Sequence, residues 1–131
     1  MLTPDQLWLF LPVGYLLTVM IETPVLFVGL SPIHSWRDKL LAGLGLTACT
    51  YPIVVLVLPL VLEERFGHGV YLAVAETFAP LAECAVFWWL FEPTSPPPSR
   101  REFWRDMAAV IIANLASFGT GELLYVLLGN R

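Results

Sequence analysis

The sequence predicts an all-α fold: an integral membrane bundle of four transmembrane helices, arranged as two duplicated helical hairpins. Composition is the first observation behind this prediction. Of the 131 residues, 57% are hydrophobic and only 14% are charged, whereas a soluble domain needs roughly 25% charged residues to cover its surface. The second observation is that the apolar residues gather into four stretches, each long enough for the roughly 20 helical residues that cross a bilayer core of ~30 Å. A faint repeat between the two halves of the chain is the third.

The four apolar stretches follow one another with short connections between them. We expect spanning helices at residues 6–30, 40–62, 70–91 and 107–128. The first stretch has no Lys or Arg before its apolar core and no small-residue cleavage site after it, so we expect it to span the membrane rather than to act as a signal peptide. Because the stretches leave little chain for a soluble part, residues 1–131 are predicted to form a single transmembrane domain.

Small residues and prolines inside the stretches predict how the helices pack and bend. The fourth stretch has a small residue at every fourth position, which lets another helix approach closely: Ala109, Ala113, Ser117 and Gly121. Prolines lie within or near the first three stretches, at Pro24, Pro52, Pro59 and Pro80. Each proline removes one backbone hydrogen bond and frees a carbonyl about one turn earlier. Such carbonyls either serve as oxygen partners for a cation or a protonated acid, or result from prolines that only shape the bundle.

Basic residues in the connections predict the orientation in the membrane. Five of the seven Lys and Arg residues fall in the first and third connections: Arg37, Lys39, Arg100, Arg101 and Arg105. Arg65 and Arg131 lie on the other side. Because basic residues concentrate in cytoplasmic loops, we expect these two connections in the cytoplasm and both termini on the non-cytoplasmic side of a plasma or inner membrane. Tryptophans near the ends of the stretches are typical of the membrane–water interface.

The two halves of the chain resemble each other. IETPVLFVGLSP aligns with AECAVFWWLFEP, so that Glu22 matches Glu83. After the next connection, Trp-Arg-Asp at 36–38 matches Trp-Arg-Asp at 104–106. Chance similarity among apolar segments would also produce such matches, but the matched acids favour duplication. Two hairpins of one orientation would be related by a pseudo-twofold axis along the membrane normal.

Four glutamates fall inside the predicted spans: Glu22, Glu76, Glu83 and Glu122. An acid at the centre of a membrane helix costs ~2.5–3.5 kcal/mol on insertion scales. No Lys or Arg lies deep in a predicted span, so we expect protons, bound cations or hydrogen-bond donors to compensate these acids. Removal from water would keep some of them neutral at pH 7, and Glu22 and Glu83, if close, would share one proton.

The depths of the acids predict two polar tiers. Glu22 and Glu83 lie eight residues from the inner ends of their stretches, or ~12 Å of helix rise, at the depth of Asn114. The supporting polar residues of this inner tier are Thr47, Thr50 and Ser117. Glu76 and Glu122 lie six residues from the outer ends and form the outer tier. Because Glu76 and Glu83 are seven residues apart, they share a helix face, which we expect to point into the bundle or into a seam between chains.

Several classes of function find no support in the sequence. It has no Gly-rich phosphate loop and no HExxH, CxxC or GxSxG motif, so we predict neither an enzyme nor a cofactor. His34 and His68 fall in the first and second connections, and we expect both at the surface, on opposite sides of the membrane; a metal site is left undecided. Cys49 and Cys84 lie in apolar runs and are expected to be small packing residues. A net charge of −4 without a basic patch argues against nucleic-acid binding.

The favoured function is a small transporter or channel component linked to a proton or a small cation, with the four glutamates and Asn114 as binding residues. Because 131 residues barely enclose a pathway, we expect a homo-oligomer or an assembly with partner membrane subunits in the lipid bilayer. The alternative is an accessory or assembly subunit of a larger membrane complex, whose polar faces meet partner helices. A membrane enzyme or lipid-binding protein, with the acids in a lateral groove, ranks last.

Overall fold

The protein is an all-helical bundle in a computed structural model, which describes residues 4–94 and 96–129 and their side chains except those of 4–10, 125, 128 and 129. The long helices are α1 (Pro4–Gly29), α2 (Trp36–Pro52), α4 (His68–Leu90) and α5 (Arg100–Gly129). After α2 the chain continues through the short segments η1 (Ile53–Val57), η2 (Pro59–Glu63) and α3 (Glu64–Phe66). The described residues contain no strand. Four helical stretches in them are long and apolar enough to cross a membrane, so the predicted all-α class and number of helices are confirmed.

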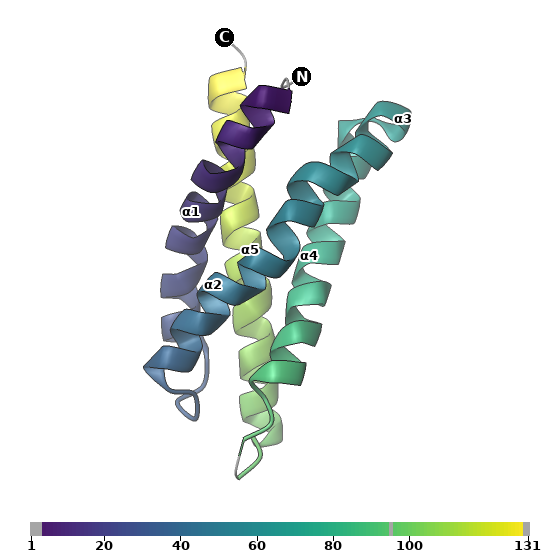
Figure 1. Cartoon of the computed structure of the whole chain (residues 1–131). Helices are drawn as coiled ribbons and strands as arrows, with labels where there is room; N and C mark the ends of the chain where they lie inside the picture. Colours follow the sequence, from purple (N-terminus) through teal and green to yellow (C-terminus); the bar gives the residue numbers. More distant parts are fainter. Residues whose placement is uncertain (1–3, 95, 130–131) are drawn as a thin grey trace.

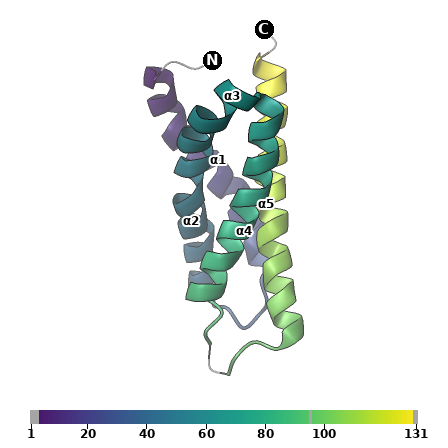
Figure 2. The same cartoon turned by 90° about the vertical axis from the view of Figure 1, so that its right-hand side faces the viewer.

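The four long helices form a ring in which neighbours run in opposite directions (Figure 1). Helix α1 packs against α2 and α5, and α4 packs against the same two helices. Helices α1 and α4 are therefore diagonal to each other. The α1–α2 and α4–α5 connections lie at one end of the bundle, here called the loop end, and the outer ends of α1 and α5 lie at the other, here called the terminal end. Figure 2 shows α3 at the terminal end, where the chain turns into α4.

Two helices begin earlier than the apolar stretches because serines cap their first turns. The Asp38 amide donates a hydrogen bond to Ser35 Oγ at 3.2 Å at the start of α2. At the start of α5, the Glu102 amide donates to Ser99 Oγ at 3.2 Å, and the Ser99 amide donates to Glu102 Oε1 at 3.0 Å. This reciprocal pair is a capping box, which satisfies two amide groups of the first turn. The helices thus extend through polar residues that hydropathy excludes from a predicted span.

Two basic side chains hold the end of α1. Lys39 Nζ donates to the carbonyls of Phe27 and Leu30 at 3.2 and 3.4 Å. Arg105 Nε donates to the carbonyl of Gly29 at 2.9 Å. The last carbonyls of a helix lack partners within the helix and carry its partial negative charge, so cations are favourable there. Both residues therefore stabilise the loop end as well as contributing to the predicted charge asymmetry.

Small residues bring α1 close to both of its neighbours. A Cβ atom on Gly43 of α2 would clash with the side chain of Thr23 of α1. A Cβ atom on Gly29 would lie 2.9 Å from the Cβ of Ala109. Ala109 belongs to the predicted small-residue stripe of α5 and is buried, whereas Gly121, at the other end of that stripe, is exposed. The stripe therefore forms a close helix contact near the loop end, as small residues in membrane helices often do.

The segment after α2 is wound more widely than an α-helix, and one proline there exposes a carbonyl. The Leu58 amide donates to the carbonyl of Ile53, five residues earlier. In the same register the carbonyl of Val54 faces residue 59, a proline, which has no N–H to donate. The Tyr71 hydroxyl of α4 donates to Val54 O instead, at 2.8 Å. This proline therefore frees a carbonyl, and a side chain from another helix satisfies it.

Candidate functional site

A central cluster of polar side chains lies inside the bundle, at about the middle of the helices. It consists of Glu22, Thr47, Thr50, Glu83, Asn114 and Ser117. The Glu22 carboxylate is 3% exposed and accepts hydrogen bonds from Thr47 Oγ1 at 2.6 Å and Ser117 Oγ at 2.8 Å. Donors from α2 and α5 thus meet a carboxylate from α1. The structure thus brings together three residues of the predicted inner tier, Glu22, Thr47 and Ser117.

Glu83 brings a second carboxylate to the cluster from α4, the helix diagonal to α1. Its side chain is 1% exposed and lies close enough to Glu22 for their charges to interact, with Asn114 beside it as a donor. Among the described residues, Glu83 Oε2 has no hydrogen-bond partner, and neither acid forms an ion pair with Lys or Arg. Thr50 donates to the carbonyl of Leu46 in its own helix at 3.2 Å. Among the described residues, the hydrogen-bond partners of these two buried acids are therefore uncharged.

A cavity of about 180 Å³ connects the central cluster to residues nearer the terminal end. Its lining includes Glu22, Asn114 and Ser117 at one end and Tyr71 and Glu122 at the other. This volume is enough for several water molecules, since one water occupies about 30 Å³ in the liquid. Glu22 therefore lines a space large enough for water that extends toward the terminal end of the bundle.

Apolar side chains close the bundle on the opposite side of the central cluster. Leu26 lies one turn below Glu22, and Phe87 one turn below Glu83, toward the loop end. Val110 lies one turn below Asn114. All three side chains are at most 2% exposed. This apolar layer separates the central cluster from the polar residues at the loop end.

The structure does not bring the two acids of the predicted outer tier together. Glu76 is exposed on the outside of α4, although Glu83 is buried. The buried stripe of α4 follows Phe87, Glu83, Ala79 and Ala75, and steps of four residues turn this stripe by about 40° each in a helix of 3.6 residues per turn. By the level of Ala75 the stripe has rotated away from Glu76. The expectation that both acids face the interior of this bundle is therefore wrong for Glu76, and the alternative, a seam between chains, stays open.

Glu122 meets a histidine rather than Glu76. His68 Nε2 lies 3.6 Å from Glu122 Oε2, and His68 Nδ1 lies 2.7 Å from Glu63 Oε1. The three side chains are each about one third exposed. The prediction for His68 is a solvated turn, and its partial exposure agrees with this, but its two acidic neighbours hold it beside Glu122, which lines the cavity.

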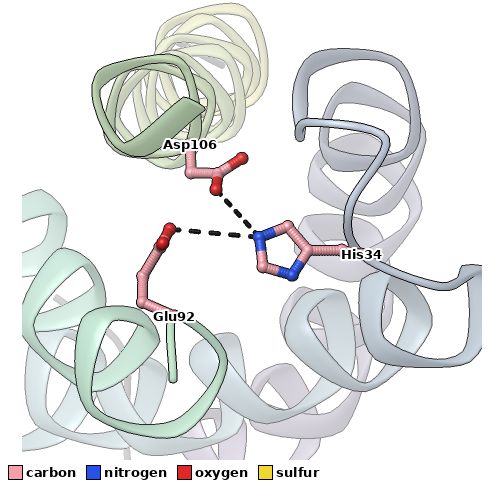
Figure 3. A group of neighbouring side chains, drawn as sticks. All are labelled: His34, Glu92 and Asp106. Carbon is pink, nitrogen blue, oxygen red and sulfur yellow. Dashed lines mark hydrogen bonds and ion pairs between the residues drawn. The ribbon is translucent and has the colours of Figure 1, made fainter. Parts of the chain in front are cut away.

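A third polar group lies buried at the loop end, here called the loop-end cluster (Figure 3). Its three titratable members come from three segments: His34 from the α1–α2 connection, Glu92 from the residues after α4, and Asp106 from the second turn of α5. A turn closed by the His34 amide and the Ser31 carbonyl, at 3.2 Å, places the imidazole under the bundle. The Glu92 amide donates to the carbonyl of Phe87 at 3.3 Å, which curls the end of α4 inward.

The partners of the two acids in the loop-end cluster differ sharply. Asp106 accepts hydrogen bonds from the Ser31 amide at 2.7 Å and from Ser31 Oγ at 3.1 Å, and His34 Nε2 lies 2.8 Å from its Oδ2. Glu92 has both carboxyl oxygens buried without a hydrogen-bond partner among the described residues, and Oε1 lies 3.9 Å from His34 Nε2. Burial, followed by the nearby Asp106 carboxylate, raises the pKa of Glu92 to about 8.

The expectation that His34 lies at the surface is wrong, since this residue is only 5% exposed. Three segments up to 72 residues apart in the chain fold over the imidazole, and no local pattern reveals such contacts. Glu92 and Asp106 were not identified as functional candidates from the sequence. A weak signal was present, since both acids directly flank apolar stretches and Asp106 belongs to the repeated Trp-Arg-Asp.

Comparisons with known proteins leave the function to be argued from geometry. No protein-family model, no curated protein and no solved structure matches this chain. The central cluster with its cavity and the loop-end cluster are the two arrangements whose chemistry can carry such an argument.

Proposed function

We propose that this chain is an integral membrane protein that binds and passes a proton or a small cation at Glu22 and Glu83. The four apolar helical stretches support its insertion in a membrane. The large apolar side chains that a soluble protein would bury are exposed over much of the surface, among them Met20, Val28 and Leu60 at 70–81%. Such a surface suits lipid rather than water.

Several features support a defined orientation in the membrane. The four tryptophans nearest the loop end are 59–71% exposed, as interfacial anchors would be: Trp36, Trp88, Trp89 and Trp104. The connections at this end carry most of the basic residues. We therefore place the loop end in the cytoplasm and both termini on the non-cytoplasmic side.

The arrangement of the helices also supports the two-hairpin origin. A twofold axis that exchanges the two hairpins would exchange α1 with α4 and α2 with α5, and each of these pairs is diagonal in the ring. The matched acids Glu22 and Glu83 then approach the same axis from opposite sides. Lys39 and Arg105 bond to carbonyls at the end of α1, and in the described part of the chain no basic side chain does the same at the end of α4. Any duplication has therefore since diverged.

The single observation that carries the proposed function is the buried Glu22–Glu83 pair, whose Glu22 member lines the cavity. Two carboxylates cannot both be ionised in a water-poor interior without compensating positive charge. The groups around Glu22 are hydroxyls, which can donate to the acid but cannot neutralise it. A proton or a small cation, arriving through the cavity, would supply the charge and would be free to leave again. The apolar layer at Phe87 would keep the site closed toward the loop end in this conformation.

Ion flux into vesicles tests the proposal. The purified chain would be reconstituted in phosphatidylethanolamine–phosphatidylglycerol vesicles, and proton flux would be followed with an internal pH dye under a valinomycin-imposed potential. Sodium flux would be followed in parallel by radiotracer. We expect Glu22→Gln and Glu83→Gln to lose most of the flux, because an amide cannot exchange a proton and is a poorer cation ligand. Glu64→Gln, the same substitution in an exposed turn, is the matched control.

Two results would end this proposal. One is an unaltered chain that carries neither ion above the level of empty vesicles. The other is a full flux in both cluster variants, with the variants shown to be folded by circular dichroism. Since glutamine can still accept hydrogen bonds from Thr47 and Ser117, folding of Glu22→Gln is expected.

A second function, an accessory subunit of a larger membrane complex, is favoured by the position of Glu76. This acid is exposed within an apolar helix that is long enough to cross a membrane. An acid facing lipid costs up to ~2.5–3.5 kcal/mol, the value at the centre of a membrane helix, and a partner helix with a hydrogen-bond donor would reduce this cost. Purification in mild detergent separates the two functions: a stoichiometric second polypeptide that is lost with Glu76→Leu favours the accessory subunit, and a chain that self-associates and conducts alone favours the transporter.

A further inference from the structure

We propose that the loop-end cluster binds one divalent transition-metal ion, for which Zn²⁺ is the best fit, through His34 Nε2 and one carboxylate oxygen each from Glu92 and Asp106. The site would tie together the α1–α2 connection, the end of α4 and the start of α5. It is separate from the central cluster and does not depend on the transport of ions there.

The positions of the three donors are compatible with a single ion. One ligand atom of each residue lies within 4.8 Å of the corresponding atoms of the other two. His34 Nε2 lies 2.8 Å from Asp106 Oδ2 and 3.9 Å from Glu92 Oε1. Zn–N and Zn–O bonds of ~2.0–2.1 Å in tetrahedral geometry place ligand atoms ~3.3 Å apart, so these two distances differ from that value by ~0.5 Å. Figure 3 shows both carboxylates directed toward the same edge of the imidazole ring.

With both acids ionised, the charge of the cluster suits a divalent cation. His34, Glu92 and Asp106 are 5%, 4% and 0% exposed, so water screens them poorly. When both carboxyl groups are ionised, their charge exceeds the one positive charge that a protonated imidazole would supply. A neutral imidazole and two carboxylates together match the charge of a divalent ion, and this donor set suits zinc or its neighbours better than Ca²⁺ or Mg²⁺, which prefer oxygen ligands alone.

The unpartnered carboxylate of Glu92 is the observation that points most directly to a ligand. Both of its oxygens are buried, and neither has a hydrogen-bond partner in the described part of the chain. Leaving a buried polar group without a partner is costly, and more so when it carries charge. A metal ion between Glu92 and His34 would satisfy this carboxylate.

Surrounding contacts already hold two of the donors in position. The Ser31 amide and hydroxyl bind the Asp106 carboxylate, which fixes its orientation as outer partners of metal ligands commonly do. The Phe87 ring packs edge-on against His34, with ring centroids 5.2 Å apart and planes at 77°. With three protein ligands, a fourth coordination position would remain for water.

Metal binding by the full chain tests this proposal. The chain, freed of any affinity tag and stripped with a chelator in detergent, would be titrated with Zn²⁺ alone by calorimetry, and bound metal would be counted by mass spectrometry. We expect one Zn²⁺ per chain and a higher unfolding temperature with metal than without it. Changes to outer partners of metal ligands alone weaken binding by ~10–100-fold, so Glu92→Gln, which removes a ligand, should weaken it by at least ~100-fold. Glu64→Gln should bind as the unaltered chain does.

Cobalt substitution identifies the ligands independently of any variant. Co²⁺ bound to nitrogen and oxygen alone gives visible d–d bands without the near-ultraviolet charge-transfer band of a thiolate ligand. A thiolate band would assign the metal to Cys49 or Cys84 and overturn the proposal. So would the absence of stoichiometric binding of Zn²⁺, Mn²⁺ and Co²⁺ to the unaltered chain, or unchanged affinity in a folded Glu92→Gln variant. If Glu92→Gln does not fold, the spectrum and the stoichiometry of the unaltered chain decide.

Discussion

The replacement Asp106→Ala should destabilise the protein far more than the replacement of its sequence counterpart, Asp38→Ala. Both acids end a Trp-Arg-Asp segment near the start of a helix. Asp106 is 0% exposed, and its carboxylate is bonded to the Ser31 amide, the Ser31 hydroxyl and His34. The Asp38 amide donates to Ser35 Oγ, and the Asp38 carboxylate has no hydrogen bond to any residue that the structure describes. The pair therefore compares a buried acid with a surface acid in the same local sequence.

The expected magnitudes follow from these contacts. Hydrogen bonds to a charged group contribute ~1.5–3 kcal/mol each but do not add fully, and removal of one partner from a buried charged pair typically costs ~3–5 kcal/mol. We expect a loss in this last range for Asp106→Ala. Asp38 lies in the first turn of α2, where an acid interacts with the helix dipole, so Asp38→Ala should cost only ~0.3–1 kcal/mol.

Equilibrium unfolding in mixed micelles measures the difference. Unfolding by increasing the fraction of sodium dodecyl sulfate would be followed by the fluorescence of the five tryptophans, with a chelator present so that metal does not contribute. If Asp106→Ala lowered the free energy of unfolding by no more than Asp38→Ala does, the reasoning would be refuted. The buried contacts of Asp106 would then add nothing to stability.

Two other predictions concern close packing and pH. Gly43→Ala should cost ~1–3 kcal/mol through the clash with Thr23. Gly45→Ala, two residues away with no atom within 4 Å of the new Cβ, should stabilise α2 by up to ~1 kcal/mol. The same unfolding assay measures both variants. If both changed the free energy of unfolding in the same direction, the close contact between Gly43 and Thr23 would be contradicted. In metal-free protein, Glu92 holds its proton up to about pH 8 when folded but has an ordinary pKa of 4.5 when unfolded. The folded state therefore binds more protons between pH 4.5 and 8, and stability relative to Glu92→Gln should fall as the pH rises through that window. A difference that rises with pH, or stays constant, would show that Glu92 is not held neutral.

The four helices could be predicted from the sequence because apolar length is a strong signal. Their ends could not be predicted as well. The second stretch was expected from residue 40 and the fourth from residue 107, yet the helices begin at Trp36 and Arg100. The capping serines at 35 and 99 add a turn or more of polar residues that hydropathy excludes. The Ser99-x-x-Glu102 pattern, read as a capping box, would have found the start of α5.

Some residues of the candidate sites could likewise be placed from the sequence, and others could not. Glu22, Thr47 and Ser117 could be placed together from depth alone, because straight helices of similar length keep residues of equal depth at one level. The exposure of Glu76 could not be predicted, because it depends on how α4 crosses its neighbours. The buried stripe of α4 rotates along the helix, and helix periodicity does not give crossing angles. The loop-end cluster depends on contacts between residues 72–75 apart in the chain, which no local pattern records.

The hydroxyl of Tyr71 has a consequence for how the bundle could open. It satisfies the Val54 carbonyl that Pro59 leaves without a donor. In an apolar surrounding, parting these two helices would strand a polar backbone group at a cost of ~1–3 kcal/mol or more. The segment that contains Val54 and helix α4 should therefore move together as one rigid body. An opening of the bundle around Glu22 would cost less free energy if α1 and α5, on the other side, moved instead.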